Sequence, residues 1–480
     1  MLKKPRAKEY VIASRDRVPF LKKLAYALGG PVDILSIWVL VSIAYPYFNM
    51  ELKMRPLYVA IILMSLRLWD GMIDPIMGCI SDNTRTRWGR RRPFILVGAI
   101  LAGLTFPLIW WFPAGLSQTQ LMCWVIGFGM LFYTFFAIWA MPYQSLLMEM
   151  TPDYHERTRV TEIRGYFQTL AGLANGCMWW LALRPCFADP ATGQASTVNG
   201  MRYISLVIAV IIIVCGVIPA LFVKERYYES SLTRNQKKVT LFKSLRETFS
   251  NGPFVMLSLF TVLFLLGTAI FDSYGRYVGT YYVLGGDWGR SSVFSVYGTF
   301  IYAIFSFIFL PVFRRLSERI GKKKCLFLSV TLVLISAIST WWTNNPAYPY
   351  LMLLNTVLIG AGYAGLWLMI PSMQVDVVDL DELKTGERRE GSFASVFSWV
   401  LKLSFCVGFL LSGPLLEWTG FNAELGAAQP AAVLTNMRIG YVALPVCALI
   451  LALILLKLFP INLAKAMEIR TQLEARRGQV

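Results

Sequence analysis

The sequence is poor in charge and nearly devoid of histidine. Of its 480 residues, 15% are charged, against about 25% in an average soluble protein, whereas 56% are hydrophobic and the mean hydropathy is +0.54. His155, the single histidine, falls in a predicted cytoplasmic loop, which excludes a histidine relay across a membrane. The eight cysteines include no CxxC pair, so neither a disulfide framework nor a zinc site is expected. Since no nucleophile–base set stands out, we expect a protein that is not an enzyme.

Long apolar runs are the most prominent feature of the sequence. Twelve of them approach the roughly 20 residues that a helix needs to cross a bilayer, which predicts an all-α polytopic membrane protein with twelve transmembrane helices. The predicted spans are, approximately, residues 24–47, 56–80, 94–112, 119–147, 161–183, 202–223, 254–283, 292–313, 325–343, 349–377, 392–417 and 437–459. Several contain glycine or proline breaks, which are tolerated where the backbone lines a cavity.

Basic residues are unevenly distributed among the loops. The 46 lysines and arginines outnumber the 28 acidic residues, and most of them lie in alternate loops. This positive-inside pattern predicts that both termini are cytoplasmic. The charge therefore reports membrane orientation and not nucleic-acid binding, and we expect a multi-pass protein of the plasma membrane, which is the inner membrane in a bacterium. The first residues are charged and lack an apolar core, so no cleaved signal peptide is expected.

A polar and basic stretch divides the twelve spans into two sets of six. We expect a cytoplasmic N-terminal segment (1–23), a first six-helix half (24–223), a cytoplasmic linker (224–253), a second six-helix half (254–459) and a cytoplasmic tail (460–480). The linker contains the pattern of an amphipathic helix on the membrane surface.

The two halves share an internal repeat. Trp88–Arg92, after the second span, matches Ile320–Lys324, after the eighth, at an offset of about 232 residues. Met141-Pro142 in the fourth span matches Ile370-Pro371 in the tenth at nearly the same offset. Two parallel six-helix halves with a site between them form the major facilitator plan, in which one half rocks against the other to give alternating access.

The second span carries charge at membrane depth. Arg67, Asp70 and Asp74 are spaced i, i+3 and i+7, so the three side chains share one helix face. Each charge costs roughly 2.5–3.5 kcal/mol at the bilayer centre, so this face must line the bundle interior or a water-filled cavity. Two like charges one turn apart repel, and a bound proton or metal cation relieves the repulsion. We therefore predict a cation site at Asp70 and Asp74; the alternative is a structural face in which Arg67 permanently neutralises one aspartate.

Lys402 is a further charge deep within a span. It lies in the segment WVLKLSF of the eleventh span, and a buried lysine either pairs with a carboxylate or loses its proton. We predict that Lys402 neutralises Asp70 or Asp74 across the two halves when the cation leaves, which would tie cation occupancy to the rocking motion. The alternative is that Lys402 snorkels to the membrane surface.

Polar and aromatic residues near the predicted centre are candidates for substrate binding. Asp33 follows a Gly-Gly-Pro break and is suited to accept hydrogen bonds from vicinal hydroxyls of a sugar; a helix-break cap is the alternative. A sugar ring would stack on an aromatic ring, whereas many aromatic residues of membrane helices only pack. The aromatic candidates, with one neighbouring amide, are Trp139, Tyr143, Trp367, Trp399 and Gln144. Arg164 and Lys402 are predicted to shape the same substrate site together with Asp33.

Charged residues near the predicted cytoplasmic ends of the spans are expected to form a gate between the halves. A single surface ion pair contributes about 0–1 kcal/mol, but a network can bias a two-state equilibrium. The predicted gate residues are Asp82, Arg85, Arg90, Arg91, Glu149, Arg157 and Asp379.

Three stretches resemble the glycoside–pentoside–hexuronide:cation symporter family, whose best-known member is the bacterial melibiose carrier. They are RLWDGMIDPIMGCISDNTRTRWGRRRPFIL, MPYQSLLMEMTPDYHERTRVTEIRGYF and DLDELKTGERREGSFASVFSWVLKL. The resemblance covers all twelve spans and implies a cation site at Asp70 and Asp74, sugar recognition by Asp33 and Arg164, and a match between Lys402 and the family's eleventh-span lysine. The arginine-rich run also resembles plant sucrose–proton symporters, which are more distant relatives.

Three residues depart from the melibiose carrier. Ala140 stands where that carrier has a sugar-binding aspartate, Ala137 where it has a threonine that helps to hold sodium, and Ile73 where it has an asparagine. Sodium needs several oxygen ligands, whereas a proton needs one carboxylate of suitable pKa. The departures favour proton coupling over sodium and argue against a melibiose-like galactoside.

The sequence thus predicts a monomeric cation-coupled symporter that imports a sugar, glycoside or uronide. No cofactor is expected beyond the coupling H⁺ or Na⁺, and no metal beyond sodium at Asp70 and Asp74, should sodium be the ion. Its predicted partners are a small carbohydrate and the lipid bilayer, with no nucleic acid.

Two alternatives stay open. Lysolipid carriers that resemble this family keep the two aspartates and a basic residue in the eleventh span, so a lysolipid or other amphiphile is one alternative substrate. A cavity open sideways to lipid and lined by apolar residues would favour the amphiphile, and a closed polar cavity would favour the sugar. A non-transporting membrane scaffold or receptor is the second alternative.

Overall fold

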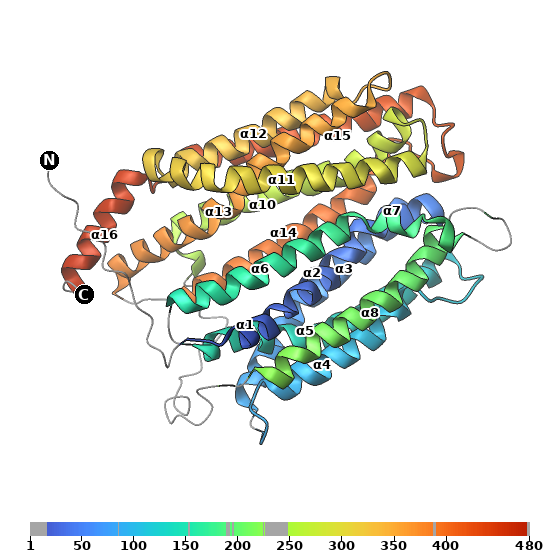
Figure 1. Ribbon diagram of the computed structural model, residues 1–480. Helices are drawn as coiled ribbons and strands as arrows, with labels where there is room; N and C mark the ends of the chain where they lie inside the picture. The colour runs from blue at the N-terminus through green and yellow to red at the C-terminus, as the bar shows by residue number, and fades with distance from the viewer. Residues whose placement is uncertain are drawn as a thin grey trace.

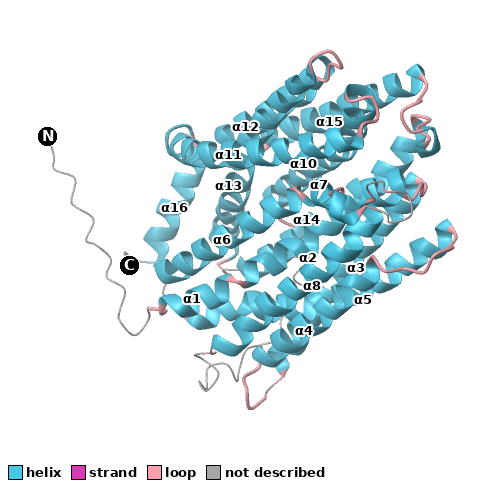
Figure 2. Cartoon of the chain, turned by 45° about the vertical axis from the view of Figure 1, so that its right-hand side comes forward, coloured by secondary structure: helices cyan, strands magenta, loops and turns pink. Residues whose placement is uncertain are grey.

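The protein is built from helices. The computed structural model describes residues 17–84, 86–151, 154–188, 193, 196–223, 225, 248–386 and 390–477. Within these ranges the regular structure is helical and no strand occurs, as Figure 2 shows. The prediction of an all-α protein is confirmed.

The first half of the chain forms the helices up to residue 222. They are α1 (Phe20–Ala27), α2 (Gly29–Ala44), η2 (Tyr45–Glu51), α3 (Pro56–Asn83), α4 (Arg92–Thr105), η3 (Phe106–Ile109), α5 (Gln118–Met150), α6 (Tyr154–Gly176), α7 (Met178–Ala182), η4 (Pro185–Phe187) and α8 (Thr197–Phe222). The predicted amphipathic helix of the linker lies outside the described residues.

The second half forms the helices from residue 252 onward. They are α10 (Gly252–Tyr277), η6 (Val278–Val283), α11 (Trp288–Ile320), α12 (Lys322–Thr343), η7 (Pro349–Leu351), α13 (Met352–Thr385), α14 (Glu390–Trp418), η8 (Ala423–Leu425), α15 (Ala431–Leu458) and α16 (Leu463–Arg477).

Eleven helical stretches within the described residues are long and apolar enough to cross a membrane. The remaining predicted span, the fifth (residues 161–183), corresponds to α6 and α7, which are separated at Cys177. The first turns of α6 read YHERTRVTEIR, and these charged residues lower the mean hydropathy of α6 below that of the eleven membrane-spanning stretches.

Polar caps define where several spans begin. The first four N–H groups of a helix have no partner within it, and a side-chain oxygen just before the helix can accept from one of them. Ser117 and Gln120 form a reciprocal capping box at the start of α5. The side chains of Ser196, Asn251 and Asp287 each accept from a backbone N–H in the first turn of α8, α10 and α11, respectively.

The helices pack into two bundles. In Figure 1, α1–α5 and α8 lie below, α10–α13 and α15 lie above, and α6 and α14 run between them. Two clusters of buried side chains correspond to these bundles, one drawn mainly from residues 18–223 and one from residues 254–461. The first cluster also includes Tyr277, Tyr281 and Phe421 from the second half, so the bundles share a buried core at their outer ends.

Two seams join the bundles, which we call the α3–α14 seam and the α6–α11 seam. At the outer end of the α3–α14 seam, Gly413 approaches Pro56 so closely that a Cβ at position 413 would lie 2.6 Å from the Pro56 carbonyl oxygen. At the α6–α11 seam, a Cβ at Gly176 would overlap the Thr299 side chain. Since the fifth span runs outward and the eighth inward, Gly176 and Thr299 are also near the outer side. The outer ends are therefore packed closely in this conformation.

Candidate cation and substrate sites

Lys402 holds the two second-span aspartates across the α3–α14 seam. Its Nζ lies 3.0 Å from Asp70 Oδ2, forms an ion pair with Asp74, and donates to the Asp70 carbonyl oxygen at 3.3 Å. The side chains of Asp70, Asp74 and Lys402 are 4%, 18% and 22% exposed, so the cluster is largely buried but retains a path to water at Asp74 and Lys402. Burial of this kind is costly for a charge unless it is paired.

Arg67 supports the same cluster from within the first half. Its Nη1 lies 3.6 Å from Asp70 Oδ2, its Nη2 donates to the Ile37 carbonyl oxygen at 3.2 Å, and its guanidinium sits 5.4 Å from the centre of the Trp38 ring. Arg67 is thus tied to α2, whereas Lys402 enters from the other half of the molecule. With all four side chains ionised the cluster is neutral, so an added cation leaves it one positive charge in excess.

Asp33 forms a second charged cluster with residues of α6. Arg164 pairs with Asp33 Oδ2, and Gln168 Nε2 donates to the same oxygen at 3.3 Å. Asp33 is 5% exposed, and its Oδ1 is buried with no hydrogen-bond partner among the described residues. A buried oxygen of this kind calls for an explanation, and a ligand hydroxyl would supply the missing donor.

Two of the predicted substrate-stacking rings are buried in a column of aromatic side chains. Trp139 stacks on Tyr143 and Tyr143 on Tyr26, with ring centres 4.5 Å and 4.6 Å apart. Tyr143 donates to the Tyr26 carbonyl oxygen at 2.8 Å, Trp139 donates to Gly216, and neither ring has exposed surface. In this conformation both rings therefore pack within the core and do not face a cavity. The Arg164 guanidinium lies 5.1 Å from the centre of the Tyr143 ring.

Trp399 and Gln144 lie at accessible positions. Trp399 is 46% exposed and its indole N–H donates to the Gly71 carbonyl oxygen at 3.1 Å, between the two aspartates of the cation cluster. Gln144, one residue after Tyr143, is also exposed. The predicted substrate residues therefore divide among the Asp33 cluster, the buried aromatic column and the cation cluster.

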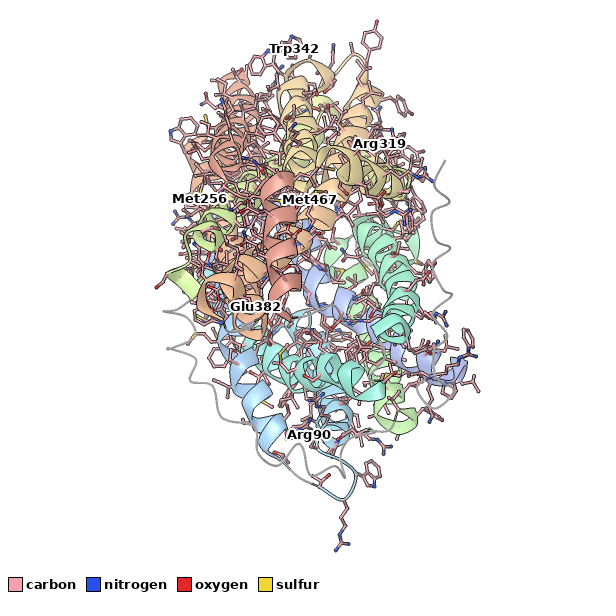
Figure 3. All side chains as sticks on the ribbon, turned by 90° about the vertical axis from the view of Figure 1, so that its left-hand side faces the viewer. Arg90, Met256, Arg319, Trp342, Glu382 and Met467 are labelled. Atoms are coloured by element: carbon pink, nitrogen blue, oxygen red, sulfur yellow. The ribbon has the colours of Figure 1, made fainter. Side chains whose placement is uncertain are left out.

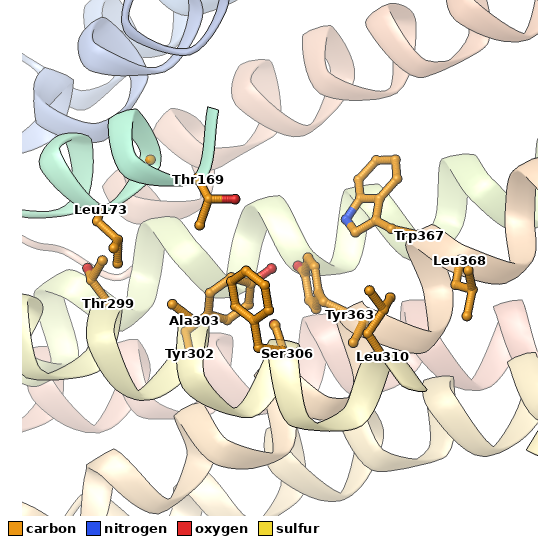
Figure 4. Close-up of a pocket in the computed structure, with 13 residues that line it drawn as sticks. Thr169, Leu173, Thr299, Tyr302, Ala303, Ser306, Leu310, Tyr363, Trp367 and Leu368 are labelled. Atoms are coloured by element: carbon orange, nitrogen blue, oxygen red, sulfur yellow. The ribbon is translucent and has the colours of Figure 1, made fainter. Parts of the chain in front are cut away.

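A cavity of about 470 Å³ lies at the α6–α11 seam (Figure 4). Its walls come from α6, α11 and α13, and they are mainly apolar with a few hydroxyl groups. The lining residues are Thr169, Gly172, Leu173, Thr299, Tyr302, Ala303, Ser306, Phe307, Leu310, Tyr363, Ala364, Trp367 and Leu368. Thr169 follows Gln168 directly in α6, so the cavity begins one residue along the helix from the Asp33 cluster.

The predicted cytoplasmic gate is described only in part. Arg85 and the side chains of Asp82, Glu149 and Arg157 lie outside the described residues, and Asp379 is half-buried near the end of α13. The backbone N–H groups of Arg90 and Arg91 donate to the Glu225 carboxylate at 3.0 Å and 2.8 Å. Figure 3, which looks along the helices from the cytoplasmic end, shows Arg90 at the end of the first half and Arg319 at the end of the second.

Several residues at these sites were not predicted. Gln168 lies four residues after Arg164, and this spacing on one helix face was a signal that could have identified it. Tyr26, Tyr302 and Tyr363 carry no such signal, because 14% of the sequence is aromatic and only packing distinguishes one ring from another.

Comparison with known proteins identifies the family. The chain matches the family described as MFS/sugar transport protein over residues 25–463. The sodium-dependent lysophosphatidylcholine symporter 1 of Gallus gallus is 28% identical, covering 98% of this chain and 92% of its own length. The isoprimeverose transporter of Lactiplantibacillus pentosus is 24% identical, covering 94% and 91%.

A solved structure shares the fold. A bacterial homolog of the human lysosomal transporter Spinster, in an inward-facing and unoccupied conformation, superposes with a TM-score of 0.68 at 15% identity, covering 96% of this chain and 98% of that one. The predicted major facilitator fold and the multi-pass membrane location are confirmed, while the narrower glycoside–pentoside–hexuronide assignment stays a prediction. Since the family match spans nearly the whole sequence, this chain belongs to the MFS/sugar transport protein family, a transporter family of the major facilitator superfamily.

Proposed function

We propose that the protein is a cation-coupled symporter, with the cation at Asp70 and Asp74. One observation carries the proposal: Lys402 of the second half is held by both aspartates of the first half. Lysine and a bound cation compete for the same two carboxylates, because each supplies the positive charge that the pair needs. Cation occupancy therefore weakens a contact between the halves.

This competition gives cation binding a mechanical effect. A ligand shifts a two-state equilibrium only by its differential affinity for the two states. In the conformation described, Lys402 occupies the carboxylate pair, so a cation binds more tightly to a conformation in which the α3–α14 seam has moved and the lysine is displaced. Because linkage is reciprocal, the movement of the halves changes the affinity for the cation by the same factor.

The α2 helix connects the cation cluster to the proposed substrate site. Arg67 donates to the Ile37 carbonyl, and Ile37 lies one turn, about 6 Å, along α2 from Asp33. Asp33 Oδ1 is the free acceptor, with Arg164 and Gln168 on the other oxygen of the same carboxylate. A substrate hydroxyl at Asp33 would thus act on the helix that also holds Arg67.

Proton coupling fits the residues around the carboxylates better than sodium coupling. Ala137 and Ile73 offer no side-chain oxygen, and the Thr134 hydroxyl already accepts from the Trp69 indole N–H at 2.9 Å. A proton needs no additional ligands. The chicken relative is named as sodium-dependent, so both ions belong in the assay.

A sugar or glycoside is the first candidate substrate, and an amphiphile such as a lysolipid is the second. The Asp33 cluster favours the sugar, because a buried carboxylate flanked by amide and guanidinium donors suits vicinal hydroxyls. The mainly apolar cavity at the α6–α11 seam favours the amphiphile, because it offers an alkyl chain a place between the halves.

Uptake into proteoliposomes would test the proposal. Labelled mono- and disaccharides, glycosides, uronides and lysophospholipids would be screened at two pH values, with and without sodium, with Asp74→Asn as the test variant. We expect uphill uptake of one class that depends on an inward proton gradient and is lost in Asp74→Asn. Uphill uptake that persists in that variant would contradict the cation site, and an absence of flux for every class would favour the scaffold or receptor alternative.

A further inference from the structure

The first span of each half ends in a π-helical segment at the same place in the repeat. η2 covers Tyr45–Glu51 and η6 covers Val278–Val283, so the two segments start 233 residues apart, which matches the offset of the internal repeat to within one residue. The i→i+5 bonds continue to the segment ends, where Leu52 N donates to Tyr47 O and Leu284 N donates to Gly279 O. π-Helices are rare and are frequently found at functional sites, so a pair at equivalent positions of the repeat indicates a shared role.

The two segments meet across the halves at the packed outer side. The Tyr277 hydroxyl, immediately before η6, donates to Asn49 Oδ1 of η2 at 2.6 Å. The rings of Tyr45 and Tyr277 lie edge to face with centres 5.7 Å apart, and the Tyr45 and Ser412 hydroxyls share a hydrogen bond of 2.5 Å. All four side chains are nearly inaccessible to solvent, so these contacts close the outer end of the central region.

The turn that follows η2 continues this closure. Lys53 adopts a left-handed backbone with φ 56°, a strained conformation for a residue with a side chain. Its Nζ donates to the Ala423 carbonyl oxygen of the second half at 2.7 Å, and Asn49 Nδ2 donates to the Met54 carbonyl oxygen at 2.6 Å. Strained residues of this kind cluster at switch regions.

We propose that η2 and η6 are the paired hinges of the outer gate, and that Asn49, Tyr277, Tyr45 and Ser412 form its lock. The inference rests on the proposed alternating-access function. A hydrogen-bonded turn of π-helix contains one residue more than a turn of α-helix. Each residue of an α-helix rotates the chain by about 100° around the helix axis. Conversion of η2 to α-helix therefore turns Asn49, which lies within that segment, away from Tyr277. Conversion of η6 moves the Tyr281 ring, which lies within that segment and stacks on Tyr277.

Hydrogen exchange measured by mass spectrometry, with no substrate and no ion gradient, tests the hinge. Asn49→Ala and Tyr277→Phe remove the same hydrogen bond, and Tyr282→Phe is the control, since that ring lies in η6 but stacks on Arg438. We expect peptides covering η2 and η6 to exchange about fivefold faster in either variant, as for loss of one hydrogen bond of roughly 1 kcal/mol, and the double variant to add little. Unchanged exchange in both segments, or a change confined to the mutated segment, would overturn the paired hinge.

A distance measurement tests the gate itself. Spin labels at Ala114 and Ala347, on exposed outer loops of opposite halves in a cysteine-free background, should report one population in the parent protein and a second, longer one in Asn49→Ala and Tyr277→Phe. An unchanged distribution would overturn the lock. Deletion of Met50 from η2 should make the longer population dominant, and an unaltered distribution in a folded deletion variant would overturn the hinge. Since neither measurement involves the cation, failure here leaves the Asp74→Asn uptake result intact, and failure of coupling leaves the gate result intact.

Discussion

The two seams between the halves are related by the repeat but differ in chemistry. The repeat exchanges the second span with the eighth and the fifth with the eleventh, so it exchanges the α3–α14 seam with the α6–α11 seam. The first carries the ion pairs of Lys402 with Asp70 and Asp74. The second opens into a mainly apolar cavity of about 470 Å³. In the proposed function, coupling depends on the first seam, whereas the second offers the alkyl chain of an amphiphile a place between the halves.

The largest effect is expected from removing a charge at the α3–α14 seam. Asp74→Asn leaves Lys402 a single carboxylate and removes a site for the coupling cation. The accumulation ratio of substrate in proteoliposomes should fall to about 1, since a carrier without coupling between its two ligands only equilibrates them. Exchange of labelled for unlabelled substrate should persist.

Asp376→Asn is the matched control for that variant. Asp376 also pairs with a lysine, Lys322 at 2.6 Å, but lies in the second half near the cytoplasmic end of α13. Its accumulation ratio should stay close to that of the parent protein. An equal loss in both variants would show that any buried aspartate matters, which would contradict the special role of the α3–α14 seam.

Removing the lysine should destabilise the fold. Lys402→Met leaves two neighbouring carboxylates buried without their shared partner, and breaking a buried pair in this way costs about 3–5 kcal/mol. The midpoint of thermal unfolding in detergent should fall by several degrees, and adding Asp74→Asn should recover part of the loss. Lys465→Met breaks an exposed pair with Glu468 and should leave the midpoint unchanged. Equal stability of Lys402→Met and the parent would argue against a tight cluster.

Filling the cavity at the α6–α11 seam tests whether a substrate occupies it. A Cβ at Gly172 would have no atom within 4 Å, so Gly172→Leu should fold normally and occupy part of the cavity. If an alkyl chain uses this space, overpacking of 1–3 kcal/mol should reduce uptake of a lysophospholipid about tenfold. Gly127→Leu, at another open glycine on α5, should have no effect. Unchanged lysolipid uptake together with strong sugar uptake would assign the substrate site to the Asp33 cluster alone.

The smallest effect is expected at Gln168. Gln168→Leu removes a 3.3 Å hydrogen bond to Asp33 while keeping the size of the side chain similar. The KM for a hydroxylated substrate should rise about fivefold, as for loss of roughly 1 kcal/mol, with the accumulation ratio unchanged. A change in accumulation ratio with unchanged KM would place Gln168 in the coupling machinery and not in substrate binding.

The sequence was most informative where charge lies in an apolar setting. Asp70, Asp74 and Lys402 stand out because ionised groups at membrane depth are costly, and the repeat placed their helices in opposite halves. The structure brings these three side chains together. The capped starts of α5, α8, α10 and α11 also follow local rules that a sequence displays directly.

Features that depend on packing were beyond the sequence. Trp139 and Tyr143 were candidates for stacking on a substrate, but both rings are enclosed by neighbouring helices, and nothing in their local sequence separates a core ring from a cavity ring. The cavity at the α6–α11 seam arises from the spacing of three helices. The π-helical segments involve one residue more per turn than an α-helix, and hydropathy cannot detect such a shift.

Cation entry driven by substrate is the most direct test of coupling at the α3–α14 seam. Proteoliposomes containing a pH dye or a sodium dye would receive an external substrate identified by the uptake screen, without any imposed gradient. We predict that substrate entry acidifies the interior in the parent protein and in Asp376→Asn, but not in Asp74→Asn. Sodium entry that is likewise lost in Asp74→Asn would keep the site and change the ion. Substrate entry with no movement of either cation would contradict the account.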